Sequence, residues 1–131
     1  MLNMKKTLTK ILDALKVDYV VEQGTSGIWT YRKWNSGIAE CWGSNQTSAT
    51  FSSWGNIYSV DISGISYPSG LFNATPICNV YTSCQGGNSV GSVNSNTGSS
   101  TTTPSLTAIR GTNLSGSQTF ITKYYAIGKW K

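Results

Sequence analysis

Apolar and polar side chains alternate along most of this 131-residue chain, a pattern that predicts β-strands. About eight such strands, separated by turn-rich segments, are typical of an antiparallel β-sandwich. No internal repeat and no second domain are visible. The predicted strands are residues 17–22, 28–34, 38–43, 57–65, 77–84, a short strand marked by Val90 and Val93, 106–110 and 118–130.

The clearest element is a β-hairpin formed by residues 28–34 and 38–43. Asn35-Ser36-Gly37 connects the two strands, and Gly37 can adopt the positive φ that a short hairpin loop needs. Because side chains alternate across a strand, Trp29 and Tyr31 share one face, while Arg32 and Trp34 share the other. We expect the first face to be buried and the second to be mixed in character.

Three polar segments interrupt the strand pattern. Residues 44–53 predict an exposed loop or irregular edge. Residues 66–74 contain Tyr67-Pro68-Ser69-Gly70, which is typical of a tight turn. Residues 85–105 are rich in Gly, Ser, Thr and Asn, and their position between strands predicts a long surface loop suited to binding.

One helix is predicted, over residues 4–16 at the N-terminus. Met4, Leu8, Ile11 and Leu15 repeat at spacings of four, three and four, which places them in one apolar seam. A helix this short needs a partner for that seam. The partner is either the chain's own β-domain or the helices of other copies; a membrane surface is less favoured, since no Trp or Phe anchor accompanies the lysines. The domains are then residues 1–16 and 17–131.

Composition favours a turn-rich β-protein over a helical enzyme or a disordered chain, with 38% hydrophobic and only 11% charged residues. The net charge of +5 divides into +3 over residues 1–16 and +2 over the rest. The β-domain therefore lacks the basic stripe of a nucleic-acid-binding protein. No segment is long enough to span a membrane, so we expect no membrane insertion.

The side chains that usually perform catalysis or bind metals are scarce. The chain has no His, which removes the commonest general base, and Cys41, Cys78 and Cys84 lack the spacing of a zinc site. We expect no metal, no cofactor and three small buried thiols, with a disulfide from Cys41 to either of the others left open. A glycosidase requires two facing carboxylates, and Glu22 and Glu40 could meet across adjacent strands. Two exposed strand carboxylates near Arg32 and Lys33 are the far commoner arrangement. We expect no enzymatic activity.

Glycan binding is better supported, because sugars are commonly held by aromatic faces together with amide and hydroxyl groups. Two tryptophans lie beside turns and two asparagines lie in the long polar loop. The candidate ligand-binding residues are Trp34, Trp54, Asn94 and Asn96.

Three segments resemble the C-terminal domains of bacteriophage and prophage tail fibres and minor structural proteins. They are GTSGIWTYRKWNSGIAECWG at residues 24–43, FNATPICNVY at 72–81 and YYAIGKWK at 124–131. The resemblance spans residues 19–131 and depends on the placement of Trp, Gly and Pro. It implies a virion protein that is made in the bacterial cytoplasm.

The resemblance implies a head domain that attaches a tail to a host surface ligand, such as a cell-wall polysaccharide, without catalysis. The expected partners are other tail proteins, the host glycan and two further copies in a homotrimer. The oligomerisation residues would be Met4, Leu8, Ile11 and Leu15 around the threefold axis. The alternatives are a purely structural trimerisation protein and a polysaccharide-degrading tail enzyme.

Overall fold

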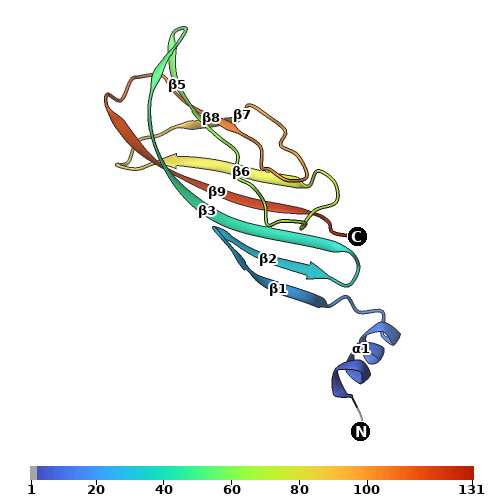
Figure 1. The fold of residues 1–131 in the computed structure, drawn as a ribbon. Helices are drawn as coiled ribbons and strands as arrows, with labels where there is room; N and C mark the ends of the chain where they lie inside the picture. The colour runs from blue at the N-terminus through green and yellow to red at the C-terminus, as the bar shows by residue number, and fades with distance from the viewer. Residues whose placement is uncertain (1–2) are drawn as a thin grey trace.

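The computed structural model describes residues 3–131, which form one helix and nine strands (Figure 1). The first two residues of the predicted segment 1–16 lie outside this range. The elements are α1 (Met4–Ala14), β1 (Val20–Ser26), β2 (Trp29–Trp34), β3 (Ile38–Thr50), β4 (Ser52–Trp54), β5 (Ile57–Ile62), β6 (Ile77–Cys84), β7 (Gly91–Asn94), β8 (Leu106–Arg110) and β9 (Ser117–Lys129).

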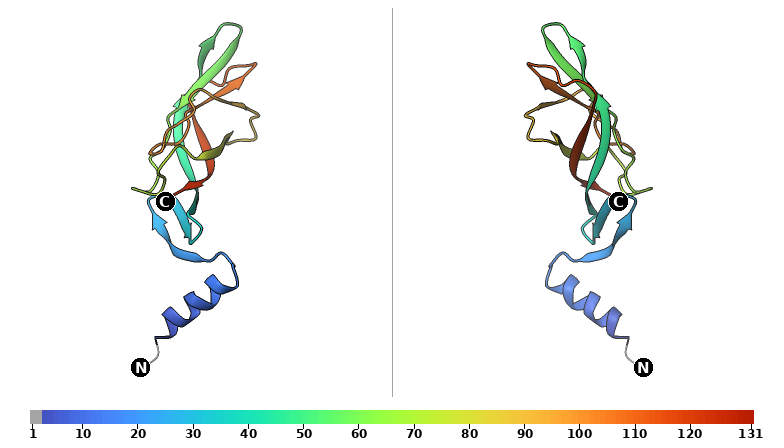
Figure 2. Two further views of the ribbon diagram at one scale, coloured as in Figure 1. Left: turned by 90° about the vertical axis from the view of Figure 1, so that its right-hand side faces the viewer. Right: turned by 90° about the vertical axis from the view of Figure 1, so that its left-hand side faces the viewer.

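The strands form two antiparallel sheets. One has five strands in the order β1-β2-β3-β9-β6, and the other has four in the order β4-β5-β8-β7. The two further views show the twisted sheets with α1 projecting from one end (Figure 2). The predicted antiparallel β-sandwich preceded by a short helix is confirmed.

The central pair of the larger sheet is much longer than the sequence indicates. All 13 residues of β3 pair with β9, from Ile38 opposite Lys129 to Thr50 opposite Ser117. The prediction of a loop over residues 44–53 is therefore wrong. Ser, Asn, Gln and Thr are acceptable on this part of the strand because Ser44, Gln46 and Ser48 are exposed and the inner Asn45 and Thr47 are only half-buried. Likewise, β1 begins later than predicted and continues to Ser26.

Two hydrophobic clusters stabilise the sandwich. One lies between the sheets, where Phe51 and Phe120 stack with ring centroids 5.6 Å apart. Phe51 separates β3 from β4, so the chain passes from one sheet to the other at a buried aromatic residue. The other lies on the inner face of β2, β3 and β9, where Trp29 contacts Tyr67 and Tyr124. The predicted burial of this face of the hairpin is confirmed for Trp29, whereas Tyr31 is only half-buried.

Connecting segments, rather than strands, cover this second cluster. Tyr67 and Leu71 of the predicted turn are buried against the sheet, and Trp29 Nε1 donates a 2.7 Å hydrogen bond to the Ser66 carbonyl. Part of the predicted surface loop 85–105 is buried too, since Thr103 is only 2% exposed and its amide donates to the Ile65 carbonyl. The polar composition of these segments did not indicate their burial.

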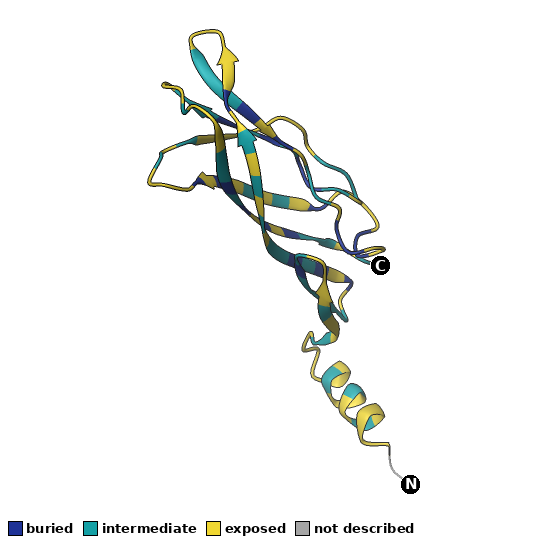
Figure 3. Cartoon of the chain, turned by 60° about the vertical axis from the view of Figure 1, so that its left-hand side comes forward, coloured by how far each residue is buried: buried dark blue, intermediate teal, exposed yellow. Residues whose placement is uncertain are grey.

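Helix α1 packs against none of the strands described for the chain. It begins at Asn3, whose side chain accepts a hydrogen bond from the Lys6 amide, and ends where Lys16 adopts a positive φ of 56°. None of its residues is buried, and the burial colouring shows this along its whole length (Figure 3). Docking of the seam on the chain's own β-domain, one of the two alternatives, is therefore wrong.

The three cysteines are free. Cys41 and Cys78 lie in one cross-strand row with Ala126 of β9 between them. Two strand spacings separate their Cα atoms by about 9–10 Å, beyond the reach of a disulfide. Burial raises the pKa of the Cys41 thiol to about 12. Cys41 and Cys84 are buried as predicted, whereas Cys78 is half-buried.

Candidate functional site

The four residues predicted to bind a glycan lie in three different places. Trp34 is half-buried at the end of β2, Trp54 ends β4, and Asn94 and Asn96 lie at and beyond the end of β7. The β4–β5 hairpin is at the end of the molecule away from α1, whereas the β2–β3 turn is at the end near it (Figure 1). The structure therefore does not combine them into one site.

Trp54 lies beside a hollow on the outer face of the four-stranded sheet. Its side chain is 58% exposed, and Ser59, Asp61 and Thr107 complete the lining of a space of about 270 Å³. Val60 and Ile62 point into the core, so the alternation of β5 places Ser59 and Asp61 outside. Thr107 Oγ1 donates a 2.7 Å hydrogen bond to Asp61 Oδ1. A flat apolar ring, a carboxylate and two hydroxyls thus meet at one exposed hollow.

Asn94 and Asn96 line a second space of about 340 Å³, together with Cys78, Ser95, Thr97 and Pro104. Asn96 Oδ1 accepts a 2.8 Å hydrogen bond from the Gly98 amide, so its side chain holds the loop in shape. No aromatic ring lines this space. It therefore matches a sugar site less well than the hollow at Trp54.

Trp34 takes part in a cluster on the outer face of the five-stranded sheet, centred on Glu40. Glu40 accepts hydrogen bonds from Trp34 Nε1 at 3.3 Å and from the Tyr125 hydroxyl at 2.5 Å. Arg32 Nε lies 3.2 Å from Glu40 Oε1, as an ion pair in which the N–H does not point at the oxygen. The hydrogen bond to Glu40 raises the pKa of Tyr125. Sequence reasoning missed Tyr125 because β9 is 85 residues away from Glu40 along the chain.

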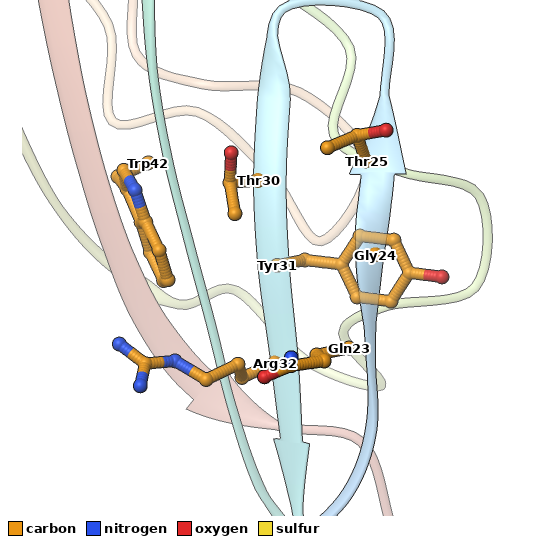
Figure 4. A pocket seen from close by; sticks show the side chains of 7 residues that line it. All are labelled: Gln23, Gly24, Thr25, Thr30, Tyr31, Arg32 and Trp42. Carbon is orange, nitrogen blue, oxygen red and sulfur yellow. The ribbon is translucent and has the colours of Figure 1, made fainter.

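A depression of about 400 Å³ adjoins this cluster (Figure 4). The Arg32 guanidinium stacks over the Trp42 ring, with its central carbon 4.8 Å from the ring centroid. Figure 4 shows the Arg32 side chain extending from β2 past β3 on the side of Trp42. The register places Thr30 opposite Trp42, a pairing that follows from the hairpin alone and that the sequence could therefore have predicted. The lining residues are Gln23, Gly24, Thr25, Thr30, Tyr31, Arg32 and Trp42.

The carboxylate pair that would suit a glycosidase is not formed by Glu22 and Glu40. Glu22 pairs with Lys33 in the register and forms a 3.0 Å ion pair with it, whereas Glu40 pairs with Arg32. Lys33 and Arg32 are successive residues of β2, so the two glutamates lie on opposite faces of the sheet. The less favoured alternative, in which they meet across neighbouring strands, is wrong, and each carboxylate lies beside a basic residue of β2 instead.

Residues 3–131 contain no group of three or more Cys, Asp or Glu side chains placed to hold a metal ion. Within the same range, no helix has the length and apolar character needed to cross a membrane.

Comparison with solved structures places the fold among the C-terminal domains of tail fibres. A search for matching protein families found none, and no curated protein matched. The chain is similar to the structure of a P. aeruginosa R1 pyocin fibre comprising C-terminal residues 323–701, with a TM-score of 0.50 and 16% identity. The match covers 92% of this chain and 31% of the pyocin chain, so this chain spans about a third of that structure.

A second match is an N-truncated R1-type pyocin tail fibre, with a TM-score of 0.45 and 13% identity over 92% of this chain and 94% of that one. The resemblance to tail-fibre C-terminal domains expected from the sequence is confirmed as a likeness of fold.

Proposed function

We propose that this chain is the host-attachment domain of a phage-type tail fibre, and that it binds a polysaccharide of the cell surface without catalysis. The observation that carries the proposal is the exposed Trp54 ring beside Asp61, Ser59 and Thr107. A tryptophan that served only the core would be covered, as Trp29 is at 3% exposure. The tail-fibre fold supports the same role.

The chemistry of the Trp54 hollow suits a neutral sugar. One face of a pyranose ring is lined by C–H groups and can stack on the indole, while a carboxylate accepts hydrogen bonds from hydroxyl groups. Asp61 has one oxygen bonded to Thr107, which fixes the carboxylate and leaves the other oxygen for a ligand. The β4–β5 hairpin, which carries Trp54 beside its turn, lies at the end of the molecule far from α1, where a surface would be met (Figure 1).

Three copies joined through α1 would multiply weak single-site binding. Met4, Leu8, Ile11 and Leu15 are 71%, 57%, 50% and 65% exposed, so the seam has no partner among residues 3–131. In heptad terms Leu8 and Leu15 take position a and Ile11 takes position d. Leu at position a with Ile at position d favours bundles of three or four helices over bundles of two.

Binding to immobilised cell-wall polysaccharides from a panel of bacteria tests the attachment role. We expect Trp54→Ala to abolish binding to any polysaccharide that the unmodified protein captures, and Trp54→Phe to retain part of it. Tyr81→Ala is the matched control, since Tyr81 is an equally exposed aromatic residue (55%) on the outer face of the other sheet. If Trp54→Ala binds the polysaccharide as well as the unmodified protein does, the hollow at Trp54 is not the binding site.

Light scattering tests the assembly. The full chain should have the mass of a trimer, and a chain beginning at Val17 should be a monomer, because the seam is absent and no strand contacts α1. A trimer without residues 1–16 would place the interface in the sandwich. A monomer in both cases would contradict the fibre assembly.

A purely structural role is the second candidate, and a specific surface favours it. Ile77, Tyr81 and Tyr125 are 74%, 55% and 39% exposed on the outer face of β6 and β9. If these residues lie at contacts with other tail proteins, their alanine variants will lose assembly while Trp54→Ala leaves every function intact.

A further inference from the structure

The depression at Arg32 differs from the Trp54 hollow in charge. Its seven lining residues include one cation and no acid, whereas the lining of the Trp54 hollow includes one acid and no cation. An anionic group is therefore attracted to the first and repelled from the second. The two lie on the outer faces of different sheets.

We propose that the Arg32 depression is a second glycan-contact site that binds an oxyanion, a carboxylate or phosphate carried on a sugar polymer. The inference deepens the proposed function and rests on it for the identity of the polymer. It assigns the acidic substituents of the ligand to one sheet and its neutral rings to the other.

The guanidinium is held in place before any ligand arrives. Trp42 supports one face of it at 4.8 Å, and Trp34 lies 6.0 Å away. The described ion pair of Arg32 uses Nε, so the fork of Nη1 and Nη2 remains for a ligand. Two parallel N–H groups match the two oxygens of a carboxylate or phosphate. A fork fixed by stacking loses little rotamer freedom when it binds.

Glu40 offsets part of this attraction, since one of its oxygens lies 3.2 Å from Arg32 Nε, but its carboxylate also accepts hydrogen bonds from other donors. Its side chain is 13% exposed, against 39% for Arg32, and Trp34 and Tyr125 donate hydrogen bonds to it. The carboxylate is thus turned towards donors of the sheet, while the cation faces solvent. Sugar hydroxyls beside the anion would meet Gln23, Thr25 and Thr30, which line the same depression and are all neutral hydrogen-bonding residues.

The test is a binding titration of the full chain followed by NMR, with three soluble probes. These are an oligogalacturonate (carboxylate), a glycerol-phosphate oligomer (phosphate) and a neutral maltooligosaccharide. We expect at least one anionic probe to shift the Trp42 indole signal and to bind more weakly as salt is added. The anionic probe that binds more tightly shows whether the site prefers a carboxylate or a phosphate. If neither binds, the proposal is overturned.

Gln23→Glu is the decisive variant, because it adds a carboxylate opposite Arg32 and leaves the Arg32–Glu40 pair in place. We expect affinity for the anionic probe to fall about tenfold or more. Ser48→Glu is the matched control: it adds the same charge at an exposed position on the same face of β3, outside the depression. If neither variant changes the affinity for the anionic probe, or if both lower it equally, the site is overturned. Thermal melts confirm that both variants are folded.

The outcome is separable from that of the attachment proposal. Loss of polysaccharide binding in Trp54→Ala, combined with no binding of anionic probes, leaves attachment standing and removes only the Arg32 site. Binding of an anionic probe that Gln23→Glu abolishes supports the Arg32 site even if Trp54→Ala has no effect on polysaccharide capture.

Discussion

Helix α1 and the β-sandwich satisfy their apolar side chains in opposite ways. The sandwich buries two clusters, in which Phe120, Ala39 and Cys41 are fully enclosed, whereas α1 buries no residue. The sandwich therefore contains what it needs to fold alone, and the helix does not. Substitutions in the sandwich should change stability, and substitutions in α1 should change assembly.

The largest expected effect is in the core between the sheets. Phe120 is fully buried and stacks on Phe51, so Phe120→Ala should lower the free energy of unfolding by about 3–5 kcal/mol. Leu8→Ala in α1 removes a seam residue that touches no strand and should change sandwich stability by less than about 0.5 kcal/mol. Urea denaturation of both variants measures this. If both variants lose a similar free energy of unfolding at every protein concentration, the helix contributes to the stability of the sandwich and the contrast between the two regions is wrong.

A smaller loss is expected where a connecting segment meets the sandwich. A Cβ at Gly64 would overlap the Thr103 carbonyl oxygen and lie 3.1 Å from Thr102 Cγ2, so the backbone must shift to accept it. We expect Gly64→Ala to cost about 1–3 kcal/mol. Gly111→Ala is the control, since nothing lies within 4 Å of its Cβ. Thermal melts should separate the two, and equal melting temperatures would show that the covering segments are not tightly packed.

Alkaline pH should weaken the sandwich and spare the helix. Burial raises the pKa of Cys41 from 9.0 to about 12, so between these values the folded state keeps a proton that the unfolded state has lost. The contribution of this thiol to stability is complete below pH 9 and falls as pH rises towards 12, by at most about 1.4 kcal/mol per pH unit. Denaturation from pH 8 to 10.5 should show a shallower decline in Cys41→Ala. An unchanged pH profile would exclude this role.

The smallest effect concerns the link between the two regions. Asp18 accepts hydrogen bonds from the Ser36 hydroxyl at 2.6 Å and from its amide at 2.9 Å, which ties the segment after α1 to the β2–β3 turn. The bond from the Ser36 hydroxyl lowers the pKa of Asp18, so the tie should persist until acidic pH and weaken as pH falls through that lowered value.

Asp18→Asn should increase motion of α1 without altering the melting temperature. Heteronuclear NOE values for residues 4–14, compared with those of the sandwich, measure this motion. Asp61→Asn is a control because Asp61 lies on β5, outside the link. No change in the helix values would mean that the tie does not hold the helix.

Local pattern predicted the hairpin, β6, β8 and the helix, because each depends on alternation or heptad spacing within a few residues. It failed for residues 44–50, where Ser, Asn, Gln and Ala outnumber the two strand-favouring threonines and the partner β9 supplies the hydrogen bonds. It also missed the burial of Tyr67 and Thr103, since each is covered by a segment distant in sequence.

The candidate sites divide in the same way. The exposure of Trp54 could be predicted because the turn beside it is local in sequence. Thr107, which completes the hollow, lies opposite Asp61 only through the β5–β8 register. The cluster at Glu40 needs β9 as well as the hairpin. Sites formed by three strands cannot be located before the sheet order is known.

The length of the β3–β9 pair has a mechanical consequence. The two strands run along the long axis, with α1 towards one end and the β4–β5 hairpin at the other (Figure 1). A pull between the N-terminus and residue 55 enters the sandwich at β1 and leaves it after β3, so it loads the β1–β2 pairs in shear, while β9 pairs with all 13 residues of β3 and holds that strand in the sheet. We expect high unfolding forces in single-molecule pulling between the N-terminus and residue 55. If the chain is the host-attachment domain that we propose, this arrangement would resist unfolding while an attached particle is dragged by flow.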